Sequence, residues 1–196
     1  QFKYNLKDPR NLDAAFRQVF NGGWTYSKQG ATPNGTNGYS DTKFSPSSHF
    51  VSLQNSHLSF YSRTQQRGGV DIGSSAAGTE VALSADLNIS SIFAYGNLGN
   101  QSTNNLTPNA STGFFVLSRT SSTLIKLLQN SILLQTNTNS NTTSIPSANI
   151  YLGTLTTLYS SRQTAFATIG DGLSDSEASA MYTSVQNYQN SMQRQV

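Results

Sequence analysis

The sequence predicts an all-β protein, an antiparallel sandwich of two sheets with a helix at its C-terminal end. From residue 49 onward, short apolar segments alternate with polar turns, a pattern typical of antiparallel sandwiches. Apolar residues make up 35% of the 196 residues and are spread along the chain, so we expect a single modest core. In the last quarter, an apolar strand at 164–169 leads through a Gly-Asp-Gly turn into an amphipathic helix at 174–195.

The start of that last helix carries a capping signature. The Ser174 hydroxyl can accept a hydrogen bond from the Glu177 amide while the Glu177 carboxylate reaches back, as in a capping box. Residues at helical spacing then form one narrow apolar stripe: Ala178, Met181, Tyr182, Val185, Gln189 and Met192. We expect this stripe to pack against the sheets.

The N-terminal segment, residues 1–23, is expected to hold a short helix. Its proposed apolar face consists of Leu12, Ala15, Phe16 and Val19. Gly22 and Gly23 would end it, and the sandwich would then occupy residues 24–196.

The remaining elements are expected to be strands and polar connections. Strands are expected at 24–26, 49–53, 58–64, 70–73, 80–87, 91–96, 113–118, 124–128, 132–134, 149–153 and 164–169. Polar loops are expected at 29–39, 97–111 and 135–148.

Composition excludes several classes of function. Charged residues are only 11% of the chain, and Ser, Thr, Asn and Gln together account for 84 residues. Such an uncharged polar surface suits association with copies of the same chain or sugar-rich surroundings. Basic residues are scattered, so no nucleic-acid partner is expected. The chain has no cysteine, and no window approaches the ~18 apolar residues of a membrane span. It begins with Gln1, so we expect a processed product or a domain cut from a longer protein.

One aromatic segment is a candidate sugar-binding site. Sugar recognition uses an aromatic face for the ring C–H groups and planar amides for the hydroxyls. The candidate residues are Trp24, Tyr26, Asn34, Asn37 and Tyr39. The plainer interpretation, which we favour, is that Trp24 anchors the core and that Asn34 and Asn37 are turn residues.

Two segments resemble laminin-G-like domains, which belong to the concanavalin A-like jelly rolls. Residues 113–134 resemble their central hairpin, with Asn130 kept and Ser131 in place of the usual glycine. The ending, Leu-Ser-Asp-x-Glu at 173–177 followed by Met181 and Tyr182, resembles their closing motif. The resemblance implies a concanavalin A-like jelly roll.

A narrower resemblance covers roughly residues 20–196. The segments 22–25, 33–39, 58–64 and 193–196 resemble domains of tailed-phage and marine viral structural proteins. This resemblance implies a non-enzymatic virion surface module, of the tail-fibre or capsid-decoration type, at the virion surface or outside the cell. Its implied partners are other virion structural proteins, copies of itself and host surface glycans. The alternative is a secreted cellular carbohydrate-binding or adhesion domain.

Catalysis and metal binding find little support. Glycosidases of the concanavalin A-like folds need two carboxylates about 5 Å apart, and no expected strand carries such a pair, because Glu80 and Asp86 lie at opposite ends of theirs. The sequence contains no Gly-x-Ser-x-Gly motif. Laminin-G relatives often hold Ca²⁺ at the loop rim. Asp41 and Asp71 are the weak candidates here, although hydrated surface carboxylates are the preferred interpretation and no cofactor is expected.

Overall fold

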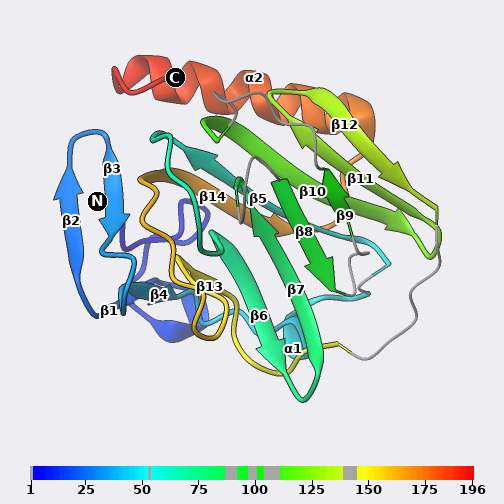
Figure 1. Cartoon of the computed structure of the whole chain (residues 1–196), viewed down its shortest axis with the longest axis horizontal. Helices are drawn as coiled ribbons and strands as arrows, with labels where there is room; N and C mark the ends of the chain where they lie inside the picture. Colours follow the sequence, from blue (N-terminus) through cyan, green and yellow to red (C-terminus); the bar gives the residue numbers. More distant parts are fainter. Residues whose placement is uncertain (1, 53, 87–91, 97–100, 104–110, 139–144) are drawn as a thin grey trace.

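The computed structural model describes residues 2–52, 54–86, 92–96, 101–103, 111–138 and 145–196 (Figure 1). The described strands form two seven-stranded sheets that pack face to face. Sheet I has the order β1 (Val19–Asn21), β4 (Tyr39–Asp41), β13 (Tyr151–Leu152), β6 (Ile72–Ala76), β7 (Thr79–Ser84), β8 (Ile92–Gly96) and β9 (Gln101–Thr103). Sheet II has the order β12 (Ile132–Asn137), β11 (Leu124–Gln129), β10 (Gly113–Ser121), β5 (Ser56–Ser62), β14 (Thr164–Gly170), β3 (Gly30–Pro33) and β2 (Trp24–Ser27).

Neighbouring strands in both sheets are antiparallel, which confirms the expected sandwich. The principal core lies between the sheets. Leu58 and Phe60 of β5 belong to it, and Phe60 stacks on Phe115 of β10 with ring centroids 5.2 Å apart. Sheet I contributes Ile72 and Leu83, both inaccessible to solvent. Alternate residues of β5 face the other side, so this central strand is buried on both faces.

The C-terminal helix, α2 (Asp175–Ser191), covers the outer face of sheet II (Figure 1). The expected capping box is confirmed, because the Glu177 amide donates to Ser174 Oγ and the Ser174 amide donates to the Glu177 carboxylate. Ala178 and Val185 pack in one cluster with Phe114 and Val116 of β10. The expected stripe therefore faces the sheet.

The N-terminal helix is a single 3-10 turn, η1 (Asp13–Ala15). It ends at Phe16, whose φ of 54° is left-handed. Val19, expected on the same helical face, instead begins β1, which pairs with β4 in sheet I.

The strand expected at 49–53 is wrong. Pro46 at the first helical position favours a short helix, α1 (Pro46–His49). The Ser45 amide donates to Nδ1 of His49 at 2.9 Å, which holds the turn closed. Val51 follows with 95% of its surface exposed, so no buried strand forms there.

The polar connections are shorter than expected. Within 29–39, residues 30–33 form β3, a hairpin partner of β2. Residues 135–137 extend β12, and residues 101–103 form β9. The remaining parts of those two connections at 97–100, 104–110 and 139–144 lie outside the described residues. Polar residues pair readily in edge and surface strands because the ladder uses backbone groups, so polarity alone did not identify loops.

Candidate ligand-binding cavity

Sheet II is incomplete beside β14, and this gap sets the position of the candidate site. β14 pairs with β5 along its length, but with β3 only between Thr164 and Ala31. The N-terminal segment, residues 2–7, lies beside β14 at this position and is held by the Gln18 amide, which donates to the Lys3 carbonyl at 2.8 Å. The space between these elements is a cavity of ≈ 590 Å³.

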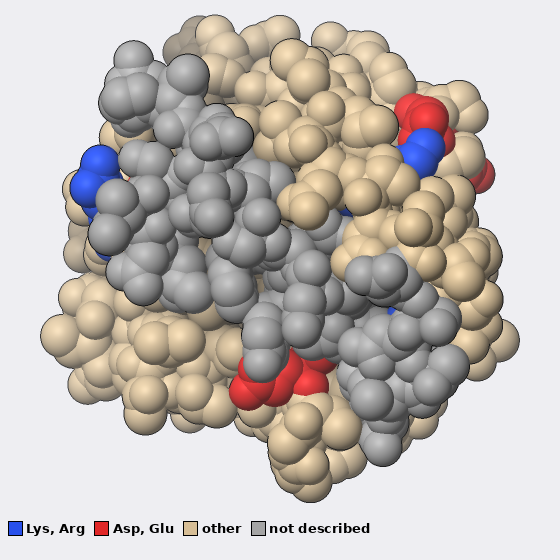
Figure 2. Space-filling model, turned by 45° about the vertical axis from the view of Figure 1, so that its right-hand side comes forward, with Lys and Arg blue, Asp and Glu red and all other residues tan. Residues whose placement is uncertain are grey.

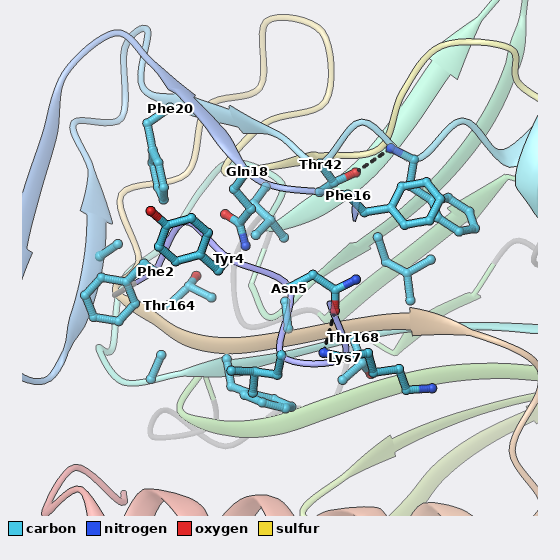
Figure 3. A pocket seen from close by; sticks show the side chains of 18 of the residues that line it. Phe2, Tyr4, Asn5, Lys7, Phe16, Gln18, Phe20, Thr42, Thr164 and Thr168 are labelled. Atoms are coloured by element: carbon cyan, nitrogen blue, oxygen red, sulfur yellow. Dashed lines mark hydrogen bonds between the residues drawn. The ribbon is translucent and has the colours of Figure 1, made fainter. Parts of the chain in front are cut away.

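Aromatic rings form much of the wall of this cavity. Figure 3 shows Phe2, Tyr4 and Phe20 on one side and Phe16 on the other. Trp24 of β2 and Phe166 of β14 also line it. Lys7 and Arg194 are its cationic residues, and no Asp or Glu belongs to its described lining. Concave, mainly apolar sites with a few polar groups are the usual form of small-molecule sites.

Trp24 and Tyr26 lie on the same face of β2, two residues apart. Their rings are nearly parallel, at an interplanar angle of 16°, and both meet the ring of Phe20 edge-on. Trp24 Nε1 donates to the Asn21 carbonyl at 2.9 Å and to the Tyr39 carbonyl at 3.2 Å, so the indole is fixed in place. Tyr26 is 52% exposed, and burial of part of its ring raises the pKa of its hydroxyl. The Trp24 ring is therefore held in place, whereas the Tyr26 ring is accessible to solvent.

Asn34 and Asn37 act as turn residues. Asn34 Oδ1 accepts hydrogen bonds from the amides of Thr36, Asn37 and Gly38, and Asn34 Nδ2 donates to Asn37 Oδ1. Asn37 Oδ1 also accepts from the Gly23 amide. These contacts hold the β3–β4 turn against residues 22–23. At Gly22 a side chain is excluded, because its φ is +68° and a Cβ would lie 2.0 Å from the Asn37 carbonyl oxygen.

Tyr39 lies on the opposite side of its sheet from this cluster. Within the β1–β4 pair, Phe20 is opposite Ser40, so Phe20 and Ser40 face the cavity side while Tyr39 faces outward. Its ring meets Tyr151 edge-on, with centroids 5.5 Å apart. The structure brings the rings of Trp24 and Tyr26 together and turns the ring of Tyr39 away from them, although the Tyr39 carbonyl accepts from the Trp24 indole.

Both metal candidates are engaged in protein contacts. Asp41 pairs with Lys43 Nζ at 3.1 Å and accepts from Asn149 Nδ2. Asp71 is buried in an ion pair with Arg162. Across the residues that the structure describes, no group of three or more His, Asp or Glu residues is placed to hold a metal ion.

The two histidines have separate surroundings. His49 of α1 packs against the rings of Phe16 and Phe44. His57 of β5 is buried and forms hydrogen bonds with the Asp171 carbonyl and the Thr168 hydroxyl. Burial lowers the pKa of His57.

The N-terminal segment and Arg194 belong to the site, although neither was among the residues predicted from the sequence. A signal for the segment was present, since Phe2, Tyr4 and Leu6 alternate with polar residues at strand spacing. Arg194 carried no such signal, because its approach to Phe2 depends on where α2 ends. Among the described helices, none has the length and apolar character needed to cross a membrane.

Neither family models nor curated protein sequences match this chain, whereas several solved structures share its fold. Domain 4 of AbnA, an extracellular GH43 arabinanase from Geobacillus stearothermophilus solved with arabinotriose, superposes with a TM-score of 0.65 at 12% identity, over 85% of this chain and 88% of that domain. The receptor-binding domain of botulinum neurotoxin C/D mosaic serotype gives 0.61 at 12% identity, over 87% of this chain and 47% of its own.

A Trypanosoma rangeli sialidase mutant displaying trans-sialidase activity gives a TM-score of 0.52 at 12% identity, over 91% of this chain and 30% of its own. The chain thus spans most of the arabinanase domain, about half of the toxin domain and about a third of the sialidase. At these identities the likeness shows the β-sandwich fold.

Proposed function

We propose that this protein is a non-enzymatic carbohydrate-recognition module whose ligand enters the aromatic cavity beside β14. The observation that carries the proposal is the aromatic wall of the cavity, which includes Trp24, fixed by its indole N–H. Tyr26 is not itself a lining residue, but its accessible ring stacks beside that of Trp24. Flat rings of this kind pack against the C–H face of a sugar. The arabinotriose complex of the arabinanase domain supports a saccharide as the class of ligand.

The acidic residues support a binding role over hydrolysis. All nine Asp and Glu residues lie in the described part of the chain, and none lines the cavity. Asp8, Asp13, Asp41, Asp71 and Asp175 pair with cations, and Glu177 caps α2. A carboxylate pair flanking a bound sugar is therefore not available at this cavity.

For the biological setting, we propose a virion surface module of the tail-fibre or capsid-decoration type that associates with copies of itself, with other virion proteins and with host glycans. The resemblance of the segments 22–25 and 33–39 to viral structural proteins supports this, and the two segments meet in one turn beside the cavity. Figure 2 shows few charged groups among the described residues of one face, which fits the uncharged polar composition expected of a surface that meets copies of itself. A secreted cellular adhesion domain is the alternative.

Titration of the protein with saccharides tests the proposed activity. Arabinotriose and a panel of animal and bacterial oligosaccharides are the probes, and calorimetry gives the dissociation constants. Tyr26→Ala should weaken binding about fivefold or more, because it removes the accessible ring. Tyr39→Ala is the matched control, since that ring faces outward, and its affinity should equal that of the wild type. Equal affinity of all three proteins would place the ligand elsewhere, and turnover of any saccharide would contradict the non-enzymatic role.

Mass spectrometry of purified virions tests the setting. The polypeptide should be a stoichiometric virion component. Its absence from virions, together with its recovery from the medium of producing cells, would favour the secreted alternative.

A further inference from the structure

Arg194 is a buried cation with no anionic partner. It is 3% exposed, and its Nε donates to the neutral amide oxygen of Gln189 at 2.7 Å. Its guanidinium otherwise lies against the rings of Phe2 and Tyr188, 5.9 and 5.1 Å from their centroids. Within the described residues no carboxylate lies within ion-pair distance of it. Arg194 lines the aromatic cavity.

Two neighbours of Arg194 also present donors without acceptors. Gln189 is fully buried, and its Nε2 has no hydrogen-bond partner. Arg63 has its Nε and Nη1 buried without partners. Burial lowers the pKa of Arg63; the charge of Tyr61 opposes this lowering and the positive charge of Arg194 adds to it. Neither side chain lines the cavity, but both leave buried donors without acceptors close to Arg194.

Two other arginines, Arg162 and Arg119, are also buried, and both donate to oxygen acceptors. Arg162 is inaccessible to solvent and donates to both oxygens of Asp71 and to backbone carbonyls around it. Arg119 donates to the carbonyls of Ser121 and Ser122. A buried charge without compensation is costly, so an anion or oxygen-rich ligand would complete the surroundings of Arg194.

We propose that Arg194, held by Gln189, binds a carboxylate of the ligand, so that the cavity selects acidic saccharides over neutral ones. Because Nε is occupied by Gln189, the two Nη groups remain to donate in parallel to a carboxylate. Lys7, which also lines the cavity, adds a second positive charge. The absence of Asp and Glu from the described lining leaves nothing there to repel an acidic ligand. The saccharide part of this inference rests on the proposed function.

Matched pairs of ligands test the selection. Calorimetry compares 3′-sialyllactose with lactose, and trigalacturonic acid with galactotriose. At least one acidic member should bind about tenfold or more tightly than its neutral partner, as expected for hydrogen bonds to a charged group. Arg194→Gln should abolish the preference and Arg194→Lys should retain part of it, because lysine keeps the charge but loses the planar fork. Arg10→Gln, which removes an exposed charge outside the cavity lining, should change nothing.

A second measurement separates failure of this inference from failure of the proposed function. Sodium acetate, against sodium chloride at equal ionic strength, should raise the Tm of the wild type and of Arg10→Gln but not that of Arg194→Gln. Equal binding of acidic and neutral saccharides would overturn the role of Arg194 and leave the proposed function intact. Binding of no saccharide, with the acetate effect present, would overturn the proposed function and keep the carboxylate site. If no saccharide binds and acetate does not raise the Tm, both the carboxylate site at Arg194 and the proposed function are overturned.

Discussion

Arg162 Nε donates to both carboxylate oxygens of Asp71, at 2.8 and 2.9 Å, and both side chains are shielded from solvent. The pair joins distant parts of the chain. Asp71 also accepts from the Ala85 amide and the Ser160 hydroxyl, and the guanidinium donates to the carbonyls of Gln66, Gly69 and Asp86. The pair therefore joins three segments: the one before β6, the one after β7 and the one before β14.

Asp71→Asn should lower the free energy of unfolding by about 3–5 kcal/mol, because it leaves the Arg162 charge buried without compensation. Urea denaturation followed by circular dichroism measures the change. Asp41→Asn is the control, since its partner Lys43 is partly exposed, and it should cost about 1 kcal/mol or less. Equal effects of the two variants would contradict the structural importance of the buried pair.

Met181→Asp should destabilise the protein by about 2 kcal/mol or more, because it places a charge between α2 and sheet II. The Met181 sulfur lies 3.8 Å from the Thr168 hydroxyl of β14. Ala180→Asp, on the exposed side of the same helix, should have little effect. Thermal denaturation checks both, and an unchanged Tm for Met181→Asp would mean that the helix does not depend on this contact.

Ser174→Ala should cost about 1 kcal/mol, because the first turn of α2 loses the hydroxyl that accepts from the Glu177 amide. The same hydroxyl and the Ser174 amide donate to the Glu177 carboxylate and lower its pKa. The variant should therefore raise the pKa of Glu177 toward its ordinary value, which NMR titration can follow. Ser179→Ala, at an exposed position in the next turn of α2, is the comparison. An unshifted Glu177 would contradict the capping geometry.

Stability should fall as the pH drops below about 6.5, the ordinary pKa of histidine. Burial lowers the pKa of His57 in the folded protein. The hydrogen bond to the Asp171 carbonyl acts in the opposite direction and raises this pKa, whereas the charge of Lys7 lowers it further. The unfolded chain then binds the proton more readily, so the contribution of His57 is present above that pH and is lost on acidification. His57→Gln should flatten the dependence of the urea midpoint between pH 7.5 and pH 5. The same slope in both proteins would contradict this role.

Structural features whose cause lies within a few neighbouring residues were predicted correctly from the sequence. The α2 cap and stripe were predicted because capping and helical periodicity are encoded within a few residues. The hairpin turn at Asn130 and Ser131 also forms, with φ of 50° and 62°, even without the usual glycine. The prediction failed at 49–53, where Pro46 and the His49 side chain favour a helical turn over the local apolar pattern.

The sequence alone determined the two-layer β architecture and its C-terminal helix, because alternation and capping act over short distances. The sequence also identified Trp24 and Tyr26 as residues of a candidate sugar-binding site. Three relationships follow from the tertiary structure instead. The ring of Tyr39 faces away from Trp24 and Tyr26, the N-terminal segment lines a cavity, and Arg194 reaches that cavity without an anionic partner. These relationships join residues far apart in the chain, and strand register together with the docking of α2 sets the distances between them.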